Sequence, residues 1–211
     1  MKVICHRGYW SSREEQNTLI ALKTALSNGF GVETDLRDQS GEVVVSHDPA
    51  INVDLSLDDL LSFYKNYDRS DTPLALNIKA DGLQENISYL LKKHRVKNYF
   101  VFDASLPDLY QYQEKKIRFF SRQSDLEKEI QLYPKSAGVW ADSFINESWL
   151  LGNKLPRVFM DNKELCIVSP ELHKRPHIAV WRQLKETFKK LDNCMICTDY
   201  PCEADEFFNK K

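Results

Sequence analysis

Two acidic residues spaced two apart are the feature of this sequence that most directly suggests chemistry. Glu33 and Asp35 lie in an apolar run that reads as a strand. In a strand, residues i and i+2 point to the same face, so both carboxylates would face the same way. Two buried acids repel each other and are costly to desolvate, and a divalent cation relieves both problems. The alternative is a solvated pair on an edge strand. We favour a metal site because the run reads as an interior strand.

Two histidines stand directly after apolar runs, in His6-Arg7-Gly8 and His47-Asp48. Imidazoles titrate near neutral pH, so two of them facing one bound group could act as general acid and general base. Arg7 and Lys79 would add fixed positive charge. With a cation they describe a site for an oxyanion, and we favour phosphate. The other histidines are expected to be solvated: His94, His173 and His177.

These residues must be positioned by the elements that precede them. Apolar, strand-like runs alternate with helical periodicity along the whole chain. Eight strands with eight following segments match a (β/α)₈ barrel. A doubly wound open sheet is the rival, but it usually needs fewer strands, and no GxGxxG loop is present. We therefore predict an α/β fold, a single (β/α)₈ TIM barrel in one domain over residues 1–211.

The predicted elements are defined by their residue ranges. The barrel strands are Lys2–Cys5, Phe30–Leu36, Leu74–Ile78, Tyr99–Phe102, Ile117–Ser121, Ala137–Ala141, Leu165–Val168 and Met195–Thr198, with a return strand at Glu42–Ser46. The helices are Glu15–Asn28, Ser56–Tyr67, Leu83–His94, Leu106–Lys116, Asp125–Leu132, His177–Leu191 and Glu203–Asn209.

The carboxyl ends of barrel strands meet at one mouth, where chemistry is found. Polar residues follow each predicted strand, and the later ones are candidates for substrate recognition. These candidates are Arg122, Trp140, Asp142 and Glu171. Trp140 could instead fill the barrel, and Arg122 could only pair with a nearby acid.

Composition limits the classes of function. The chain has 211 residues, 42% of them hydrophobic, and a formal net charge of -2. A nucleic-acid surface would normally show a basic excess, so we expect no nucleic-acid partner. The apolar runs are far shorter than the ~20 residues of a membrane span. No secretory signal is visible, so we expect a cytoplasmic location.

The five cysteines are scattered, which argues against a disulfide framework. Cys194 and Cys197 have redox or zinc spacing, but they lie in an apolar strand-like run with no second pair nearby. We expect two buried thiols there rather than a metal site.

Taken together, the motifs resemble the glycerophosphodiester phosphodiesterase family, which are TIM barrels of the phospholipase C-like phosphodiesterase group. The resemblance rests on a set of motifs in the family's order, dense up to Lys79 and sparse from there to about residue 190. The motifs are His6-Arg7-Gly8, Asn17-Thr18, Glu33-Thr34-Asp35, His47-Asp48, Lys79 and Thr198-Asp199-Tyr200-Pro201.

The resemblance implies roles for individual residues. It implies that His6 and His47 are the acid/base pair and that Arg7 and Lys79 contact the phosphate. It implies metal ligation by Glu33, Asp35 and the residue at position 77, with Mg²⁺ or Ca²⁺ as the cofactor. The implied reaction is metal-dependent hydrolysis of a small-molecule phosphodiester of the glycerophosphodiester kind.

The sequence departs from the family pattern in three ways. Gln16 stands where the family has Glu, and Asn77 stands where it has a third metal carboxylate. An amide oxygen can bind Mg²⁺ or Ca²⁺ but brings no charge, so the site should hold metal more weakly unless the substrate phosphate, Asp81 or Asp103 compensates. The stretch from His47 to the next barrel strand is short, so this resembles a compact member without the usual insertion.

Three other functions stay open. The chain could be a non-catalytic or weakly active barrel that binds a phosphorylated ligand, which Gln16 and Asn77 would permit. It could be a phospholipase D- or sphingomyelinase-like enzyme acting on a lipid headgroup. It could act on a carbohydrate linkage, although Glu33 and Asp35 on one strand suit a shared cation better than opposite sides of a bond.

Overall fold

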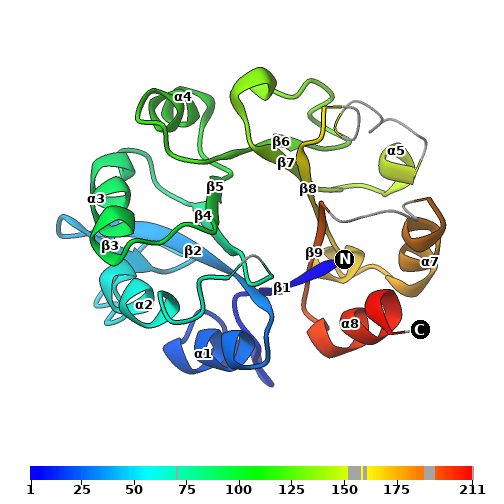
Figure 1. The fold of residues 1–211 in the computed structure, drawn as a ribbon, viewed down its shortest axis with the longest axis horizontal. Helices are drawn as coiled ribbons and strands as arrows, with labels where there is room; N and C mark the ends of the chain where they lie inside the picture. The colour runs from blue at the N-terminus through cyan, green and yellow to red at the C-terminus, as the bar shows by residue number, and fades with distance from the viewer. Residues whose placement is uncertain (70, 152–157, 159–160, 188–192, 211) are drawn as a thin grey trace. The chain divides into compact units, whose positions relative to one another are not determined.

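The fold is known from a computed structural model, which describes residues 1–69, 71–151, 158, 161–187 and 193–210 (Figure 1). The contacts divide the chain into two compact units. Residues Ile4–Phe119 form one unit, and Met1–Val3 with Phe120–Lys211 form the other. We call them the early unit and the late unit. All the residues predicted for catalysis, metal and phosphate lie in the early unit.

Parallel strands alternate with helices through the early unit. The strand β1 pairs in parallel with β2, β2 with β4, and β4 with β5, while the short β3 returns antiparallel to β2. The helices α1 to α4 lie along the outer side of these strands (Figure 1). The bounds are β1 Lys2–His6, α1 Leu19–Ser27, β2 Gly31–Gln39, β3 Glu42–Val45, α2 Leu57–Tyr64, β4 Leu74–Ile78, α3 Gln84–His94, β5 Tyr99–Phe102 and α4 Leu106–Glu114.

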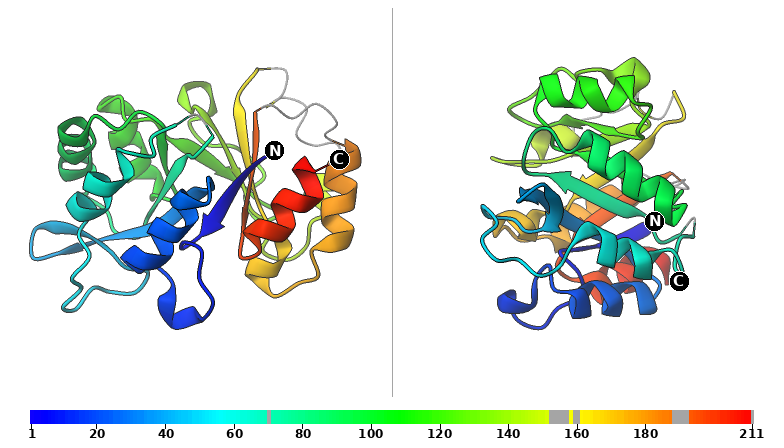
Figure 2. Two further views of the ribbon diagram at one scale, coloured as in Figure 1. Left: turned by 60° about the horizontal axis from the view of Figure 1, so that its bottom comes forward. Right: turned by 90° about the vertical axis from the view of Figure 1, so that its left-hand side faces the viewer.

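The late unit repeats the alternation. Its strands β6, β7, β8 and β9 pair in parallel in that order. The helices α7 and α8 lie side by side (Figure 2), and the Trp181 ring contacts both Phe207 and Phe208. The bounds are β6 Phe120–Gln123, β7 Gly138–Ala141, α5 Ser148–Leu151, β8 Glu164–Val168, α7 Ile178–Thr187, β9 Cys194–Thr198 and α8 Pro201–Asn209.

The hydrogen-bonded order of the strands is that of a (β/α)₈ barrel. The order is β5-β4-β2-β1-β9-β8-β7-β6, with β3 attached to β2. A single parallel bridge joins Val101 of β5 to Phe119, the residue before β6, so the order is nearly closed. This confirms the predicted fold class.

Most predicted elements agree with the structure within a few residues, and β5 agrees at both ends. The helix predicted from Glu15 begins instead at Leu19, because the hydroxyl of Thr18 accepts the backbone N–H of Ala21 as an N-cap. The segment before it contains a short 3₁₀ turn, Arg13–Glu15. The last predicted residues of the helix His177–Leu191 lie outside the described residues, which resume at 193.

The helix predicted at Asp125–Leu132 is wrong. This segment is irregular and ends in a 3₁₀ turn at Tyr133–Lys135. The Asp125 carboxylate accepts backbone N–H groups of residues 144–146, so it caps another loop. Leu132 adopts a left-handed conformation with φ of 52°, which interrupts a right-handed helix.

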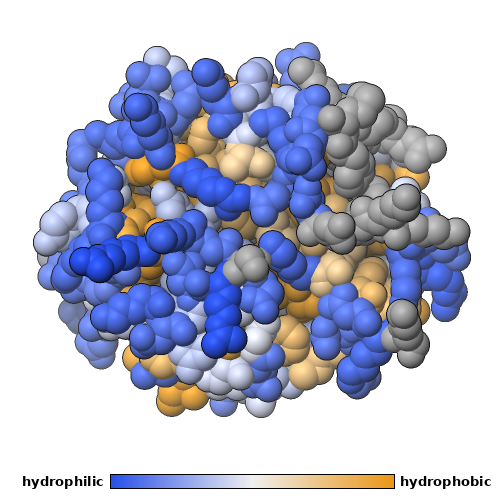
Figure 3. Space-filling view, viewed as in Figure 1, coloured by the Kyte–Doolittle hydropathy of each residue, from blue (hydrophilic) through white to orange (hydrophobic). Residues whose placement is uncertain are grey.

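The described helices include none that is both long and apolar enough to cross a bilayer. The surface visible in Figure 3 is largely hydrophilic, with smaller apolar areas between the charged side chains. The predicted burial of Cys194 and Cys197 is confirmed, since both thiols lie in the core on β9.

Candidate active site

Strand register places four of the predicted site residues on neighbouring strands of the early unit. His6 at the end of β1 is the register partner of Glu33 on β2, and Asp35 is the partner of Asn77 on β4. Register partners on parallel strands point to the same face of the sheet. The structure therefore brings His6, Glu33, Asp35 and Asn77 to one face, as the period-two spacing predicts.

Glu33 is almost completely buried, and its carboxylate is held by two neighbours. The backbone N–H of Arg7 donates to Oε2 at 3.1 Å, and Nδ2 of Asn77 donates to Oε1 at 3.3 Å. Burial, and after it the charge of Asp35, raises the pKa of Glu33 well above its ordinary value. His6, Arg7 and Lys79 oppose this shift, which places their charges within electrostatic reach of the carboxylate.

Asp35 is fully buried and lies between Arg7 and Lys79, the two residues predicted to bind phosphate. Nε of Arg7 is 2.9 Å from Oδ2, and Nζ of Lys79 is 3.4 Å from Oδ1. These contacts are ion pairs rather than hydrogen bonds, because the buried atoms Arg7 Nε and Asp35 Oδ1 have no hydrogen-bond partner. The backbone N–H of Lys79 donates to the carbonyl of Leu36 at 2.9 Å, which fixes the lysine beside Asp35. The cations thus neutralise the acid pair without saturating its oxygens.

The residues present fit a hard divalent cation. Oδ1 of Asp35 and Oδ1 of Asn77 are both buried without a hydrogen-bond partner, and buried polar atoms are rarely left so. Carboxylate and amide oxygens are the donors that Mg²⁺ and Ca²⁺ prefer. Among the described residues no group of three or more His, Cys, Asp or Glu side chains is arranged to hold a metal. A cation here would therefore depend on two carboxylates and the Asn77 amide.

The loop after β1 explains the glycine of the His6-Arg7-Gly8 motif. Gly8 has φ of +94°, and a Cβ at this position would lie 2.7 Å from the backbone carbon of Ala21. Only glycine meets both demands. Arg7 itself is left-handed, with φ of 57°, and this turns its N–H toward Glu33. The motif brings the β1 loop against α1 and aims Arg7 at the acid pair.

Asn17 belongs to this cluster, although sequence reasoning assigned it no role beyond its place in a motif. Its Nδ2 donates to Asp35 Oδ2 at 2.9 Å, and its Oδ1 accepts from the Thr34 hydroxyl at 2.8 Å. Its backbone N–H donates to the carbonyl of Arg7 at 2.9 Å. The signal in the sequence was the residue type, because asparagine tolerates the left-handed φ of 60° found here.

His47 lies on the loop after β3. The preceding residue, Ser46, donates its N–H to the backbone carbonyl of Asp35 at 3.0 Å. The imidazole is half exposed, and its Nδ1 is 2.9 Å from Asp48 Oδ1. The pKa of Asp48 is lowered mainly by this hydrogen bond, and the charge of Arg7 lowers it further. The His47 loop therefore lies within electrostatic reach of Arg7.

Three of the predicted substrate-binding residues lie together in the late unit. Arg122 on β6 and Trp140 on β7 are register partners, and Asp142 follows β7 directly. Arg122 forms a two-pronged ion pair with Glu127. The Trp140 side chain is buried. Asp142 accepts from Nε2 of His173 at 2.6 Å. These contacts match the alternative roles considered from the sequence, in which Trp140 fills the core and Arg122 pairs with a nearby acid. Roles of these residues in substrate binding stay predictions.

The fourth residue, Glu171, joins the ends of β8 and β9. Its carboxylate accepts from the hydroxyls of Ser169 and Thr198 and from the backbone N–H of Asp199. These contacts tie two strand ends of the late unit together. They occupy both carboxylate oxygens, and a role in substrate binding stays a prediction.

The three histidines expected to be solvated all have partners, so that expectation is wrong. His94 on α3 is nearly buried and lies 2.6 Å from Asp58 of α2. His173 bonds Asp142, and the His177 ring packs 4.3 Å from that of Trp181. An imidazole combines an apolar ring with polar nitrogens, so partial burial beside an acid suits it.

Several solved structures share this architecture. A glycerophosphodiester phosphodiesterase from Parabacteroides distasonis aligns over 98% of this chain and 96% of its own, with a TM-score of 0.74 and 16% identity. One from Agrobacterium tumefaciens aligns over 95% and 96%, with a TM-score of 0.69 and 15% identity. The chain has the fold of the glycerophosphodiester phosphodiesterases.

The same fold extends to a more distant enzyme. A Ca²⁺-dependent phosphatidylinositol-specific phospholipase C from Streptomyces antibioticus aligns over 100% of this chain and 96% of its own, with a TM-score of 0.60 and 11% identity. No protein-family model matches the sequence, and no curated protein matches it. The resemblance to the glycerophosphodiester phosphodiesterase fold therefore rests on structure and on the motifs.

Proposed function

We propose that the chain is a phosphodiester hydrolase that acts on a small glycerophosphodiester-like molecule with the help of Mg²⁺ or Ca²⁺. The observation that supports this most is the cluster in which two buried acids, an unpartnered amide oxygen and two cations converge. The fold neighbours, two of them named as glycerophosphodiester phosphodiesterases, support the same reaction class. We further propose that residues 1–211 act as one domain.

Each residue then has a chemical role. Glu33, Asp35 and Asn77 would hold the cation, which would supply positive charge to the phosphate oxygens. Arg7 and Lys79 bind the phosphate, which requires them to share or leave their contacts with Asp35. Their fixed charges stabilise negative charge that develops on phosphorus-bound oxygens.

The two histidines move the protons. When Nδ1 of His47 carries the proton shared with Asp48, its Nε2 is unprotonated and can accept a proton from water. The water oxygen then attacks phosphorus, and the bond from phosphorus to the alcohol oxygen breaks. The protonated His6 gives its proton to the departing alkoxide. The assignment of base and acid to these two residues is part of the proposal.

The test is hydrolysis of bis(p-nitrophenyl) phosphate and glycerophosphocholine by the purified protein with EDTA, Mg²⁺ or Ca²⁺. We expect metal-dependent turnover that falls about 10²–10⁴-fold in His6→Ala and in His47→Ala. His94→Gln is the matched control, because His94 is bound to Asp58 and outside the cluster. Its turnover should stay near that of the wild type.

Two other outcomes would point elsewhere. Folded protein that binds but never cleaves these esters with any metal would contradict hydrolysis and favour the phospholigand-binding barrel. Turnover of sphingomyelin or lysophosphatidylcholine in place of glycerophosphocholine would favour an enzyme that acts on lipid headgroups.

A further inference from the structure

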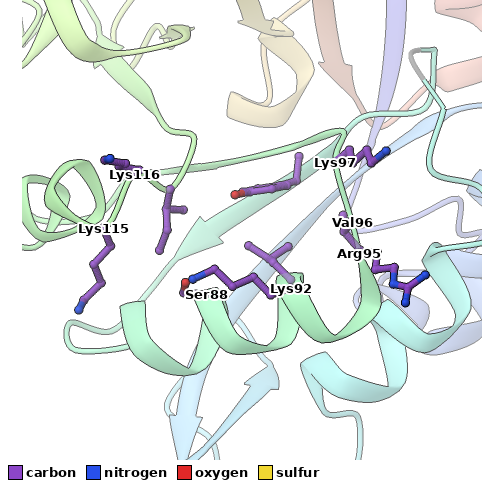
Figure 4. A pocket seen from close by; sticks show the side chains of 10 residues that line it. Ser88, Lys92, Arg95, Val96, Lys97, Lys115 and Lys116 are labelled. Atoms are coloured by element: carbon purple, nitrogen blue, oxygen red, sulfur yellow. The ribbon is translucent and has the colours of Figure 1, made fainter.

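A pocket in the early unit lies apart from the acid cluster. Its volume is about 300 Å³, at the small end of the range of roughly 300–1,000 Å³ for small-molecule sites. It is formed by the end of α3, the loop into β5 and the segment that follows α4 (Figure 4). Tyr99 is the first residue of β5, whereas Phe102, the register partner of Asn77, is the last. The pocket is therefore at the amino end of a strand whose carboxyl end borders the candidate active site.

The floor of the pocket is apolar. Leu91, Val96 and Ile117 line it, and all three are otherwise core residues. The ring of Tyr99 adds an aromatic surface. In Figure 3 an apolar area is visible between α3 and α4, bordered by hydrophilic side chains. This floor would favour a ligand with an apolar or aromatic part.

The border of the pocket is strongly basic. Five cationic side chains line it and no acidic one does; they are Lys92, Arg95, Lys97, Lys115 and Lys116. Figure 4 shows them spread around the pocket, with Arg95 and Lys97 at one end and Lys115 and Lys116 at the other. Lys115 pairs with Glu85. Within the described chain, the side chains of the other four have no ion-pair or hydrogen-bond partner.

The ordinary role of cations at helix ends explains only part of this arrangement. Cations near a helix C-terminus are stabilised by the helix dipole, which accounts for Lys92 on α3 and Lys115 after α4. Arg95 and Lys116 are left-handed, with φ of 57° and 56°, at positions where helices usually carry glycine or asparagine. Lys97 lies beyond the helix. The cations that the helix dipoles do not explain therefore surround a pocket whose floor is apolar.

We propose that this pocket binds a small organic phosphate, with its phosphate group on Lys92 and its apolar or aromatic part on Leu91, Val96 and Tyr99. The other cations around the pocket attract the phosphate through their charge. The Ser88 hydroxyl, which also lines the pocket, is a further donor for a phosphate oxygen. Such a ligand satisfies both parts of the pocket, whereas inorganic phosphate would leave the floor uncovered. Nucleotides and lysophospholipids both have this chemistry.

The test is a titration of the full chain with phenyl phosphate, followed through the methyl resonances of Leu91, Val96 and Ile117. We expect saturable shifts with a dissociation constant on the order of 1 mM, as suits so small a ligand. Inorganic phosphate and phenol, each carrying one half of the probe, should bind about tenfold more weakly or worse. AMP and a short-chain lysophosphatidate then separate the nucleotide source from the lipid source.

Variants locate the binding. Lys92→Gln should weaken the binding of phenyl phosphate about tenfold, whereas Lys65→Gln, at an exposed lysine outside the pocket, should not. Lys79→Gln changes the candidate active site and not the pocket, so the phenyl phosphate shifts of Leu91, Val96 and Ile117 should stay as in the wild type. A failure of this proposal is therefore distinguishable from a failure of the proposed hydrolysis. Shifts that do not saturate, equally tight binding of inorganic phosphate, or unchanged binding in Lys92→Gln would each overturn the proposal.

Discussion

Arg7, Asp35 and Lys79 illustrate how one buried carboxylate organises the candidate site. Both cations approach the same acid, and Asn17 donates to it as well. A buried carboxylate is costly to desolvate, and here two positively charged side chains and an amide donor surround it. In the absence of a bound metal ion, these contacts hold the side chains of Arg7 and Lys79 against Asp35.

Gly8 allows the loop after β1 to approach α1 closely, so its replacement should destabilise the fold. Gly8→Ala should destabilise the protein by roughly 2–4 kcal/mol, because it adds a clash with Ala21 to an unfavourable φ. Gly29→Ala is the matched control. Gly29 has φ of +80°, but a Cβ added there would meet open space, so the change should cost only about 1 kcal/mol. Urea unfolding measures both, and equal losses would contradict the clash.

Asn77 should set the strength of metal binding. Asn77→Glu adds a third carboxylate beside Glu33 and Asp35, so we expect Mg²⁺ and Ca²⁺ to bind about tenfold more tightly or better. Without metal the variant should melt at a lower temperature than the wild type, because three buried acids repel one another. Calorimetric titration and thermal melts with and without EDTA check this.

The control for this substitution is Asn77→Gln, which has the length of glutamate without its charge. It should not gain affinity for either metal. If both variants bind metal as weakly as the wild type, Asn77 is not a ligand position.

At the scale of elements, α2 and α3 are joined by a polar contact between their opposite ends. Asp58 near the start of α2 lies 2.7 Å from Lys93 and 2.6 Å from His94, at the end of α3. The negative group is at a helix N-terminus and the positive groups are at a C-terminus, so both suit their helix dipoles. The contact holds two helices of the early unit in place over the strands.

This contact gives a pH-dependent prediction. The hydrogen bond from His94, and then that from Lys93, lowers the pKa of Asp58. A lowered carboxyl pKa adds stability above its unfolded value of about 3.9, and that stability is lost as the pH falls through the folded pKa. Because Asp58 is partly exposed, Asp58→Asn should cost only about 0.5–1 kcal/mol at neutral pH.

The measurement is the free energy of unfolding of wild type and Asp58→Asn between pH 7 and pH 3. The difference should shrink below pH 4, roughly where the unfolded carboxyl titrates. The control is Asp54→Asn, at an exposed aspartate shortly before α2. A difference that stays constant with pH would mean that the charge of Asp58 contributes nothing.

At the scale of the whole molecule, the five thiols report on the integrity of the fold. Four are buried in the strands of the two units and only Cys202, on α8, is exposed. Burial raises the pKa of Cys194 to about 12, so its reactive thiolate is scarce at pH 8. We expect one thiol to react rapidly with a disulfide reagent in the native protein and all five in denaturant.

Cys202→Ser should abolish the rapid reaction without changing the slow one. A second fast thiol in the native protein would show that part of a strand is open. Adding Mg²⁺ or Ca²⁺ should slow the reaction of Cys5, next to His6 on β1, if the cation stabilises the early unit.

The sequence alone was enough to predict the alternation of strands and helices, the barrel and the shared face of Glu33 and Asp35. These follow from local rules, because apolar periodicity marks the elements and a strand alternates its side chains. The same rules failed at Asp125–Leu132, where a side chain caps a distant loop, and at His94, whose partner is 36 residues away.

Only the tertiary structure decided which polar groups meet. It placed Arg7 and Lys79 on the same acid, added Asn17, and tied Glu171 to the ends of two strands. It also gathered Lys92 and Lys116, far apart in the sequence, around one hollow. Such contacts depend on register and on how closely loops approach, and both are set by packing between segments that the local pattern does not encode.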